Sequence, residues 1–231
     1  MRQKNILLIG ASSGIGQKLF EMLQADGSNI FTAGRKPVES AGHLTWDAAG
    51  AESFTIPSDW PDVFDGLVYL PGTILLKPFH RLSATDFQQD FQVNVLGFVQ
   101  CMQAMLPRLK KADGSSVVVF STVAAKIGLG FHASISSAKG ALEGLALSLA
   151  SELAPSKIRV NVVAPSLTDT PLAAALLNTP EKAEASAKRH PLQRIGSVDD
   201  MASAARFFLS DGASWITGQS LTVDGGMSKL K

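Results

Sequence analysis

The chain has 231 residues, of which 45% are hydrophobic and 18% charged, the balance of an ordinary globular domain that can bury a sizeable core. Its 21 Lys and Arg residues against 20 Asp and Glu leave a net charge of +1, which favours a small-molecule partner over nucleic acid or a membrane surface. The single cysteine and four scattered histidines predict no disulfide and no metal site. No apolar run is long enough for a membrane span or a signal peptide, so we expect a cytoplasmic protein.

A glycine-rich turn near the amino terminus is the first candidate site. Residues 5–16 read NILLIGASSGIG, in which an apolar run predicts a buried strand and apolar residues at helical spacing follow the glycines. Glycines permit positive φ and close approach of a ligand, and the start of the helix attracts a pyrophosphate. We therefore predict a dinucleotide site formed by Gly10, Ser12, Ser13, Gly14, Ile15 and Gly16.

Two other interpretations of these residues stay open. Three glycines can form a turn without binding anything, since such a motif is weak evidence by itself. Gly10 to Gly14 also spell G-x-S-x-G, the nucleophile elbow of a serine hydrolase, with Ser12 as nucleophile. Only one predicted strand precedes Ser12, whereas a hydrolase elbow lies deeper in its sheet, so the position argues against a hydrolase.

The next strands carry two candidates for recognition of the adenosine half of a dinucleotide. Residues 29–33 predict a strand that ends in Gly34-Arg35-Lys36, where an NAD site would place an acidic residue. Glycine followed by two cations suits the 2′-phosphate of NADP, although a solvated charge pair is the alternative. Residues 43–46 predict a third strand, and Asp47 after it is either an adenine contact or a turn residue.

The remaining elements predict a single domain over residues 1–231. Further strands are expected at 66–70, 117–121, 159–164 and 220–223, with helices from a capping box at 83–86 to 109, at 133–153, after Thr179 and after a second capping box at 197–200. Residues 48–65 contain two prolines and predict no regular helix. Seven strands alternating with helices or crossovers indicate a Rossmann-like, doubly wound parallel α/β sheet with helices on both faces.

One residue and two surfaces stand out on the long helices. Asn94 lies in the middle of the helix that ends near Leu109, where asparagine is unfavourable, so we expect a local kink or a functional hydrogen bond. This helix and the helix at 133–153 carry apolar or small residues over more surface than one sheet face can cover. We therefore predict a homo-oligomer.

Taken together, these motifs resemble those of the short-chain dehydrogenase/reductase family over essentially the full length of the chain. The resemblance implies a nicotinamide cofactor and a dimer or tetramer, with Gly34-Arg35 similar to the NADP-preferring variant and Asp47 in the place of an adenine-contacting aspartate. It also implies roles for Asn94 as the helix asparagine and for Lys139 as the lysine that holds the nicotinamide ribose. Further matches are Thr122 in the place of the active-site serine, residues 216–226 as the terminal motif, and Pro165, Leu167 and Thr170 in the loop under the nicotinamide.

The chain departs from the family at its active-site tyrosine. Ile135 stands four residues before Lys139, where the family has that tyrosine, and the only tyrosine in the chain is Tyr69. The enoyl reductases of the family place a tyrosine seven residues before the lysine, and His132 occupies that position here. Histidine can deliver a proton at neutral pH, which isoleucine cannot. Two further family segments are altered, at Ile9 and at Tyr69-Leu70-Pro71-Gly72.

We therefore expect an NADP(H)-dependent oxidoreductase that acts on a small carbonyl or alcohol, or on an activated C=C bond. Thr122 would polarise the substrate oxygen, Lys139 would orient the ribose, Asn94 would hold a water relay, and His132 or a water would supply the proton. The alternative is a non-catalytic NADP(H)-binding protein, a sensor or assembly partner that has lost the acid.

Overall fold

Seven parallel strands form one sheet in the computed structural model, which describes residues 3–230. The order across the sheet is β3-β2-β1-β4-β5-β6-β7, which confirms the predicted Rossmann-like fold. The strands are β1 (Asn5–Ile9), β2 (Asn29–Gly34), β3 (Gly42–Thr45), β4 (Gly66–Tyr69), β5 (Ser115–Phe120), β6 (Ile158–Pro165) and β7 (Ser220–Val223). Their ends differ from the predicted ones by at most two residues, because apolar patterning locates a strand better than its ends.

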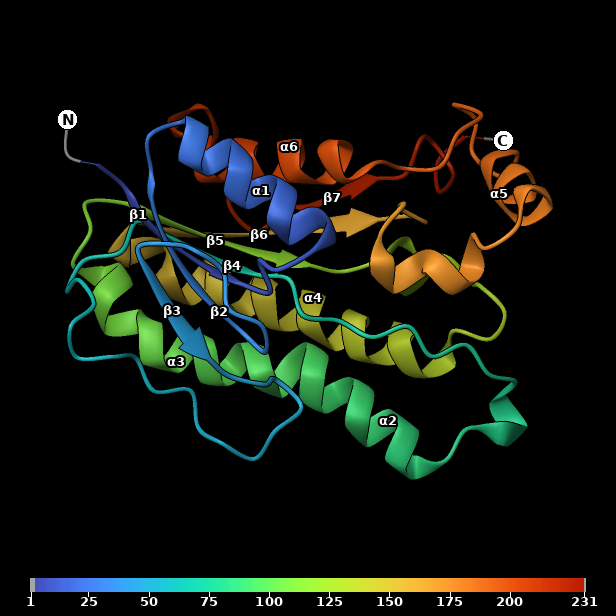
Figure 1. Ribbon diagram of the computed structural model, residues 1–231, viewed down its shortest axis with the longest axis horizontal. Helices are drawn as coiled ribbons and strands as arrows, with labels where there is room; N and C mark the ends of the chain where they lie inside the picture. The colour runs from blue at the N-terminus through green and yellow to red at the C-terminus, as the bar shows by residue number, and fades with distance from the viewer. Residues whose placement is uncertain (1–2, 231) are drawn as a thin grey trace.

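Helices cover both faces of the sheet, as Figure 1 shows. On one face lie α1 (Gly14–Ala25) and α6 (Val198–Leu209), and on the other lie α2 (Ala84–Phe91), α3 (Gly97–Lys110) and α4 (Ala133–Leu153). The short α5 (Pro180–Ala187) lies beyond the carboxyl end of β6. Both predicted capping boxes are present, because Ser83 with Asp86 and Ser197 with Asp200 exchange side-chain and backbone hydrogen bonds.

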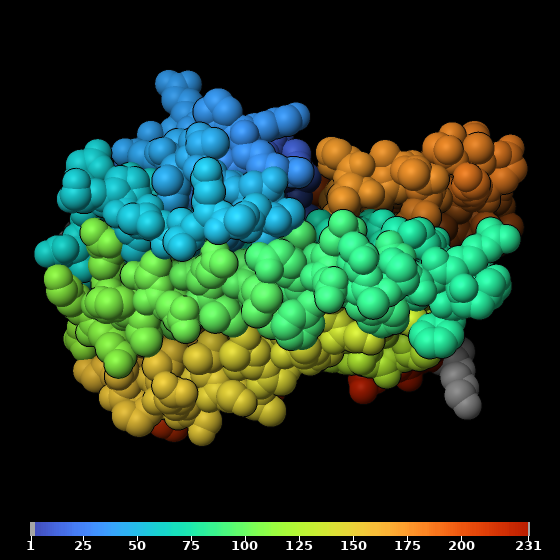
Figure 2. Space-filling view, turned by 90° about the horizontal axis from the view of Figure 1, so that it is seen from below, coloured from blue at the N-terminus to red at the C-terminus, as the bar shows by residue number. Residues whose placement is uncertain are grey.

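The core consists of two layers, one on each side of the sheet. Alternate residues of β1 point to opposite faces, so that Leu7 and Ile9 pack towards α3 and α4 while Ile6 and Leu8 pack towards α1 and α6. The run of apolar residues in β1 is buried on both faces, as predicted. In Figure 2 the band formed by α2 and α3 lies beside α4 across the outer face of the first layer.

The helix predicted from residue 83 to Leu109 is interrupted. Between α2 and α3 the backbone forms a five-residue π-helix, Gln92–Leu96, with Asn94 at its centre. A π-helix inserts one extra residue into the turn and releases backbone groups from the regular hydrogen-bond ladder. Of the two expectations for Asn94, a local kink or a functional hydrogen bond, the structure shows a local irregularity of the helix, and the predicted helical stretch consists of α2, the π-helix and α3. Residues 48–65 contain no helix, as predicted.

The strand order fixes where a ligand can enter. From β1 the chain proceeds outwards to β2 and β3, and it then returns to the other side of β1 as β4. The connections after β1 and β4 therefore leave the sheet in opposite directions and open a crevice at the carboxyl ends of these strands. Ile9 is paired with Tyr69 at this place, and the backbone N–H of Leu70 donates to the carbonyl of Ile9 (3.1 Å).

The turn from β1 into α1 depends on a close backbone contact. A Cβ atom on Gly16 would lie 2.1 Å from the carbonyl oxygen of Gly10, far inside any van der Waals contact. Glycine at this position lets the first turn of α1 pack directly on the end of β1.

We expect Gly16→Ala to lower the free energy of unfolding by about 1–3 kcal/mol, because the added methyl group must displace backbone. Urea denaturation of both proteins measures the difference. Gly128→Ala is the control, since a Cβ there meets nothing within 4 Å, and its unfolding free energy should change by less than about 0.5 kcal/mol. Equal stability of the Gly16 variant and the parent would contradict the close contact.

Candidate active site

A cleft of about 1190 Å³ lies at the carboxyl ends of the strands. Of the candidate catalytic and cofactor-binding residues, all but Asn94 line this cleft. They are Gly10, Ser12, Ser13, Gly14, Ile15, Gly16, Arg35, Asp47, Thr122, His132, Lys139, Pro165, Leu167 and Thr170. Asn94 is fully buried behind the cleft wall. Residues from distant parts of the sequence are thus brought to one place.

The glycine turn has the geometry that a dinucleotide requires. Gly10 and Gly14 have φ values of +90° and +55°, which side-chain-bearing residues rarely adopt. Ser13 is the N-cap residue of α1 but makes no side-chain cap hydrogen bond, so the first N–H groups of the helix stay available to a ligand. A Cβ on Gly14 would lie 3.5 Å from the side chain of Thr170, so the turn packs close to the loop that follows β6. The turn fits a pyrophosphate.

The edge of the cleft beyond β2 is cationic. Arg35 and Lys36 are exposed and line the cleft, and neither forms an ion pair with a residue between 3 and 230. Gly34 leaves space beside them, because a Cβ there would have its nearest neighbour at 3.9 Å. Asp47 also lines the cleft, and its carboxylate accepts from the N–H of Ala49 (3.0 Å), a turn contact that leaves the second oxygen available.

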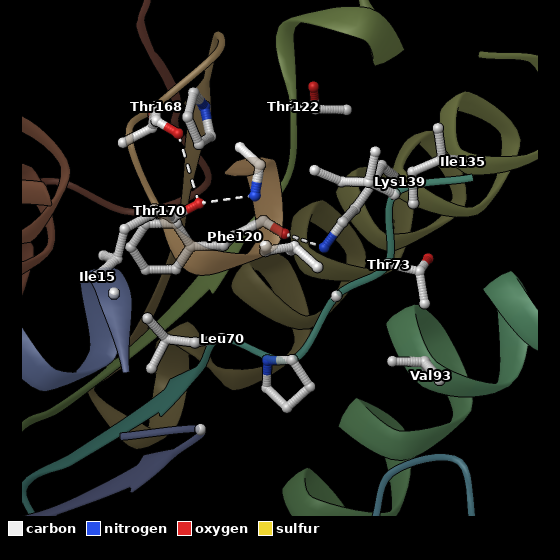
Figure 3. A pocket seen from close by; sticks show the side chains of 18 of the residues that line it. Ile15, Leu70, Thr73, Val93, Phe120, Thr122, Ile135, Lys139, Thr168 and Thr170 are labelled. Carbon is white, nitrogen blue, oxygen red and sulfur yellow. Dashed lines mark hydrogen bonds between the residues drawn. The ribbon is translucent and has the colours of Figure 1, made fainter. Parts of the chain in front are cut away.

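Lys139 is the buried cation of the site. Its side chain is only 6% exposed, and Nζ donates to the carbonyl oxygen of Phe120 at the end of β5 (2.6 Å), as Figure 3 shows. Burial lowers the pKa of Lys139 to about 7, while the charge of Asp90 acts in the opposite direction. The amine therefore changes its protonation state near neutrality.

Behind this lysine lies Asn94, held by the π-helix. Its Nδ2 donates to the carbonyl oxygen of Asp90 (2.7 Å) and to Oγ1 of Thr73 (3.1 Å), whereas its buried Oδ1 has no hydrogen-bond partner among residues 3–230. A Cβ on Gly72 would lie 3.5 Å from this Oδ1 and also 3.5 Å from Nζ of Lys139. Glycine thus leaves a small polar space between the two side chains, of the kind that a bound water fills.

An apolar residue occupies the position four residues before Lys139, where the family resemblance implies a tyrosine. Ile135 is buried in α4 and lines the cleft beside Lys139 (Figure 3). The hydroxyl of Thr122 lies opposite and accepts from the N–H of Ala124 (3.3 Å). His132 is the N-cap residue of α4, and its Nδ1 lies 2.7 Å from the carbonyl oxygen of Gly130. Because a carbonyl only accepts, Nδ1 carries the proton and Nε2 stays free.

Tyr69 does not replace the absent tyrosine. Its side chain is 1% exposed, its hydroxyl donates to the carbonyl oxygen of Val93 (2.5 Å), and burial raises its pKa far above the ordinary value. A phenol in this state does not exchange protons with the cleft.

Two polar residues of this site were not predicted from the sequence. Asp90, in α2, is 2% exposed, and one of its carboxylate oxygens accepts from Oγ1 of Thr73 (2.5 Å). Thr73 lines the cleft directly after Gly72. The available signal was the spacing, since Asp90 precedes Asn94 by one helical turn and lies among phenylalanines that mark a buried face.

Comparison with known proteins identifies the family. The family model described as "Enoyl-(Acyl carrier protein) reductase" matches residues 48–228. L-xylulose reductase of Bos taurus is 32% identical over 96% of this chain and 96% of its own length, and a tropinone reductase homologue of Arabidopsis thaliana is 30% identical over 97% and 92%. The chain belongs to the short-chain dehydrogenase/reductase family and is an oxidoreductase of that family that binds a nicotinamide cofactor.

Solved structures agree with this assignment. A short-chain dehydrogenase/reductase from Mycobacterium ulcerans superposes with a TM-score of 0.90 at 27% identity, covering 100% of this chain and 92% of the other. Aldohexose dehydrogenase from Thermoplasma acidophilum gives 0.87 at 27% identity, covering 100% and 96%. Within residues 3–230 no helix is long and apolar enough to cross a membrane, and no group of three or more His, Cys, Asp or Glu could hold a metal ion.

The burial of Lys139 predicts an unusual titration. Acetic anhydride modifies only neutral amines, so in the ligand-free protein the labelling of Lys139 should rise with a midpoint near pH 7, about three units below an ordinary lysine. Peptide mass spectrometry across a pH series measures this midpoint. Lys157 is the internal control, because the carboxylate of Asp113 raises its pKa. Coincident profiles for both lysines would contradict the buried state of Lys139.

Proposed function

We propose that this protein is an NADP(H)-dependent reductase of a small carbonyl compound or an activated C=C bond. The observation that supports the proposal is that one cleft is lined by the glycine turn and Arg35 together with Lys139 and Thr122. Such a cleft holds an extended dinucleotide with its reactive ring beside the polar side chains. Two relatives bear the names of reductases, which supports the reducing direction.

Each residue of the site has a role in this proposal. The N–H groups at the start of α1 bind the pyrophosphate, Arg35 binds the 2′-phosphate and Asp47 accepts from the adenine amino group. Lys139 donates to the nicotinamide ribose, and Pro165, Leu167 and Thr170 support the nicotinamide amide. The bound cofactor supplies the hydride. Thr122 donates a hydrogen bond to the substrate oxygen and stabilises the charge that develops there.

The proton comes from His132 or from a water beside Asn94. His132 lines the cleft with Nε2 free, so a protonated imidazole can donate towards a substrate oxygen. The space beside Gly72, between Nζ of Lys139 and Oδ1 of Asn94, suits a water that passes a proton to the cleft. Ile135 cannot serve as an acid.

The substrate end of the cleft favours a compound with an apolar body. Leu129, Phe131, Leu172 and Leu176 line it together with Ile135. Phe131 and Leu172 are largely exposed without a ligand, so a bound substrate would cover apolar surface. A dimer or tetramer of this chain, and a cytoplasmic location, stay predictions from the sequence.

We expect NADPH to bind more tightly than NADH by at least about 1.5 kcal/mol, the lower end for hydrogen bonds to charged groups. Isothermal titration calorimetry with both cofactors measures the preference. Arg35→Ala should abolish it, whereas Arg81→Ala, which removes an exposed arginine outside the cleft lining, should preserve it. Equal affinities for the two cofactors in the parent protein would reject the assignment of Arg35.

If His132 is the acid, His132→Ala should lower turnover by roughly two to four orders of magnitude while NADPH affinity stays nearly unchanged. Oxidation of NADPH with a panel of carbonyl and enone substrates measures turnover. His80→Ala is the control, since His80 is exposed outside the cleft lining.

Three other outcomes separate the remaining possibilities. Activity that depends on Thr122 but not on His132 would identify water as the proton donor. A gain of carbonyl reduction in Ile135→Tyr would show that the scaffold is poised for hydride transfer. No turnover in the parent protein or in Ile135→Tyr, with NADPH still bound, would replace the reductase proposal with a binding protein.

A further inference from the structure

A buried carboxylate lies next to the site, and none of the roles above uses it. Asp90 occupies the last turn of α2, and Oδ1 accepts a hydrogen bond from Thr73 (2.5 Å). Its Oδ2 is buried and has no hydrogen-bond partner within the described part of the chain. An ionised carboxylate removed from water in this way is costly unless a positive charge lies close by.

The hydrogen bonds around Asp90 have a defined direction. The amide nitrogen of Asn94 can only donate, and it donates to Oγ1 of Thr73 (3.1 Å). The hydroxyl of Thr73 therefore uses a lone pair for Asn94 and directs its own proton to Asp90. This arrangement presents Oδ1 of Asp90 as a hydrogen-bond acceptor.

Lys139 carries the positive charge that interacts electrostatically with Asp90. An ammonium has three donors, and the one hydrogen bond of Lys139 in the structure goes to the carbonyl of Phe120. Within residues 3–230, two buried acceptors of the adjoining network have no hydrogen-bond partner, namely Oδ2 of Asp90 and Oδ1 of Asn94. The Asn94 oxygen and Nζ of Lys139 each lie 3.5 Å from the position of a Cβ on Gly72. The charge of Asp90 is the electrostatic influence that opposes the effect of burial on the lysine. The side chain of Ile135 has no atom that can accept a hydrogen bond from the ammonium.

Several titratable groups on the neighbouring elements have partners elsewhere. The hydroxyl of Tyr69 donates to Val93, and Nδ1 of His132 donates to Gly130. The remaining pairs on these elements are Lys77 with Asp86 (2.9 Å), Glu143 with Ser121 (2.6 Å) and Glu143 with Lys126 (3.8 Å). Asp90 is the carboxylate whose charge acts on Lys139.

We propose that Asp90 is a positioning residue that keeps Lys139 protonated in the cleft, acting through its charge and through the network with Thr73 and Asn94. The inference rests on the proposed function, since a charged lysine donates better to a ribose hydroxyl and can restore a proton to a bound water.

Labelling of the ligand-free protein with acetic anhydride tests the link without any turnover. In Asp90→Asn, which preserves the shape and the hydrogen bond from Thr73, the labelling midpoint of Lys139 should fall by on the order of one pH unit. Asp62→Asn is the matched control, because Asp62 is an exposed carboxylate paired with Lys111 (3.1 Å), and the midpoint there should not change. An unchanged midpoint in a folded Asp90→Asn variant would overturn the proposal.

A second pair of variants applies if Asp90→Asn does not fold. Thr73→Val removes the hydrogen bond that stabilises the carboxylate and should also lower the labelling midpoint, whereas Thr73→Ser retains the hydroxyl and should preserve it. Equal midpoints in the two threonine variants would count against the network. Circular dichroism of each variant confirms that it is folded.

Turnover gives the functional readout. The rate should fall as pH rises through the pKa of Lys139, because the lysine loses its proton, and in Asp90→Asn this fall in kcat/KM should begin at lower pH by the same interval as the labelling. A shifted labelling midpoint with an unshifted rate profile would overturn the positioning role. No turnover in the parent protein would reject the proposed function, while the labelling would still decide whether Asp90 controls Lys139.

Discussion

The buried amine of Lys139 is the group on which the arrangement of the cleft depends. An ammonium removed from water must recover its hydration from protein acceptors and opposite charge. The acceptor comes from Phe120 at the end of β5, and the negative charge comes from Asp90 in α2. Glycine at position 72 leaves the space between Lys139 and Asn94. Strand β5, helix α2 and the loop that contains Gly72 therefore meet around the side chain of Lys139, and the sheet topology brings them together.

The chain departs from the family at residues 69–72, and the residues that surround Tyr69 accommodate its side chain. Tyr69 fills the core beneath the cleft, and its hydroxyl donates to the carbonyl of Val93, a residue of the π-helix. A Cβ on Gly97 would lie 2.3 Å from this hydroxyl, so glycine at the start of α3 makes room for the tyrosine ring. A π-helix needs partners for the backbone groups that it releases. Tyr69 thus supports the helical irregularity that holds Asn94, and its role is structural.

The fold was predictable because its signals are local. Apolar runs located most of the strands, capping boxes located the starts of α2 and α6, and the spacing of Gly10, Gly14 and Gly16 located the turn between β1 and α1. The π-helix was not predictable, since a stretch such as QVNVL continues an α-helical pattern and only the tertiary partners of Asn94 explain the extra residue. The places of Asp90 and Thr73 in the site were not predictable for a similar reason, because their hydrogen bond joins a loop to a helix 17 positions further on.

The free-energy cost of burying Asp90 and Lys139 bears on why the site contains both residues. Removing a carboxylate and an ammonium from water costs several kcal/mol for each ion, and replacement by apolar residues of similar volume is often neutral or stabilising. Ile135 shows that the α4 face tolerates such a residue directly beside Lys139. Folding alone therefore does not explain Asp90 and Lys139. A requirement for a charged amine in the cleft does explain them, because a lysine with no carboxylate behind it would lose its proton more readily and would donate one hydrogen bond fewer to a ligand.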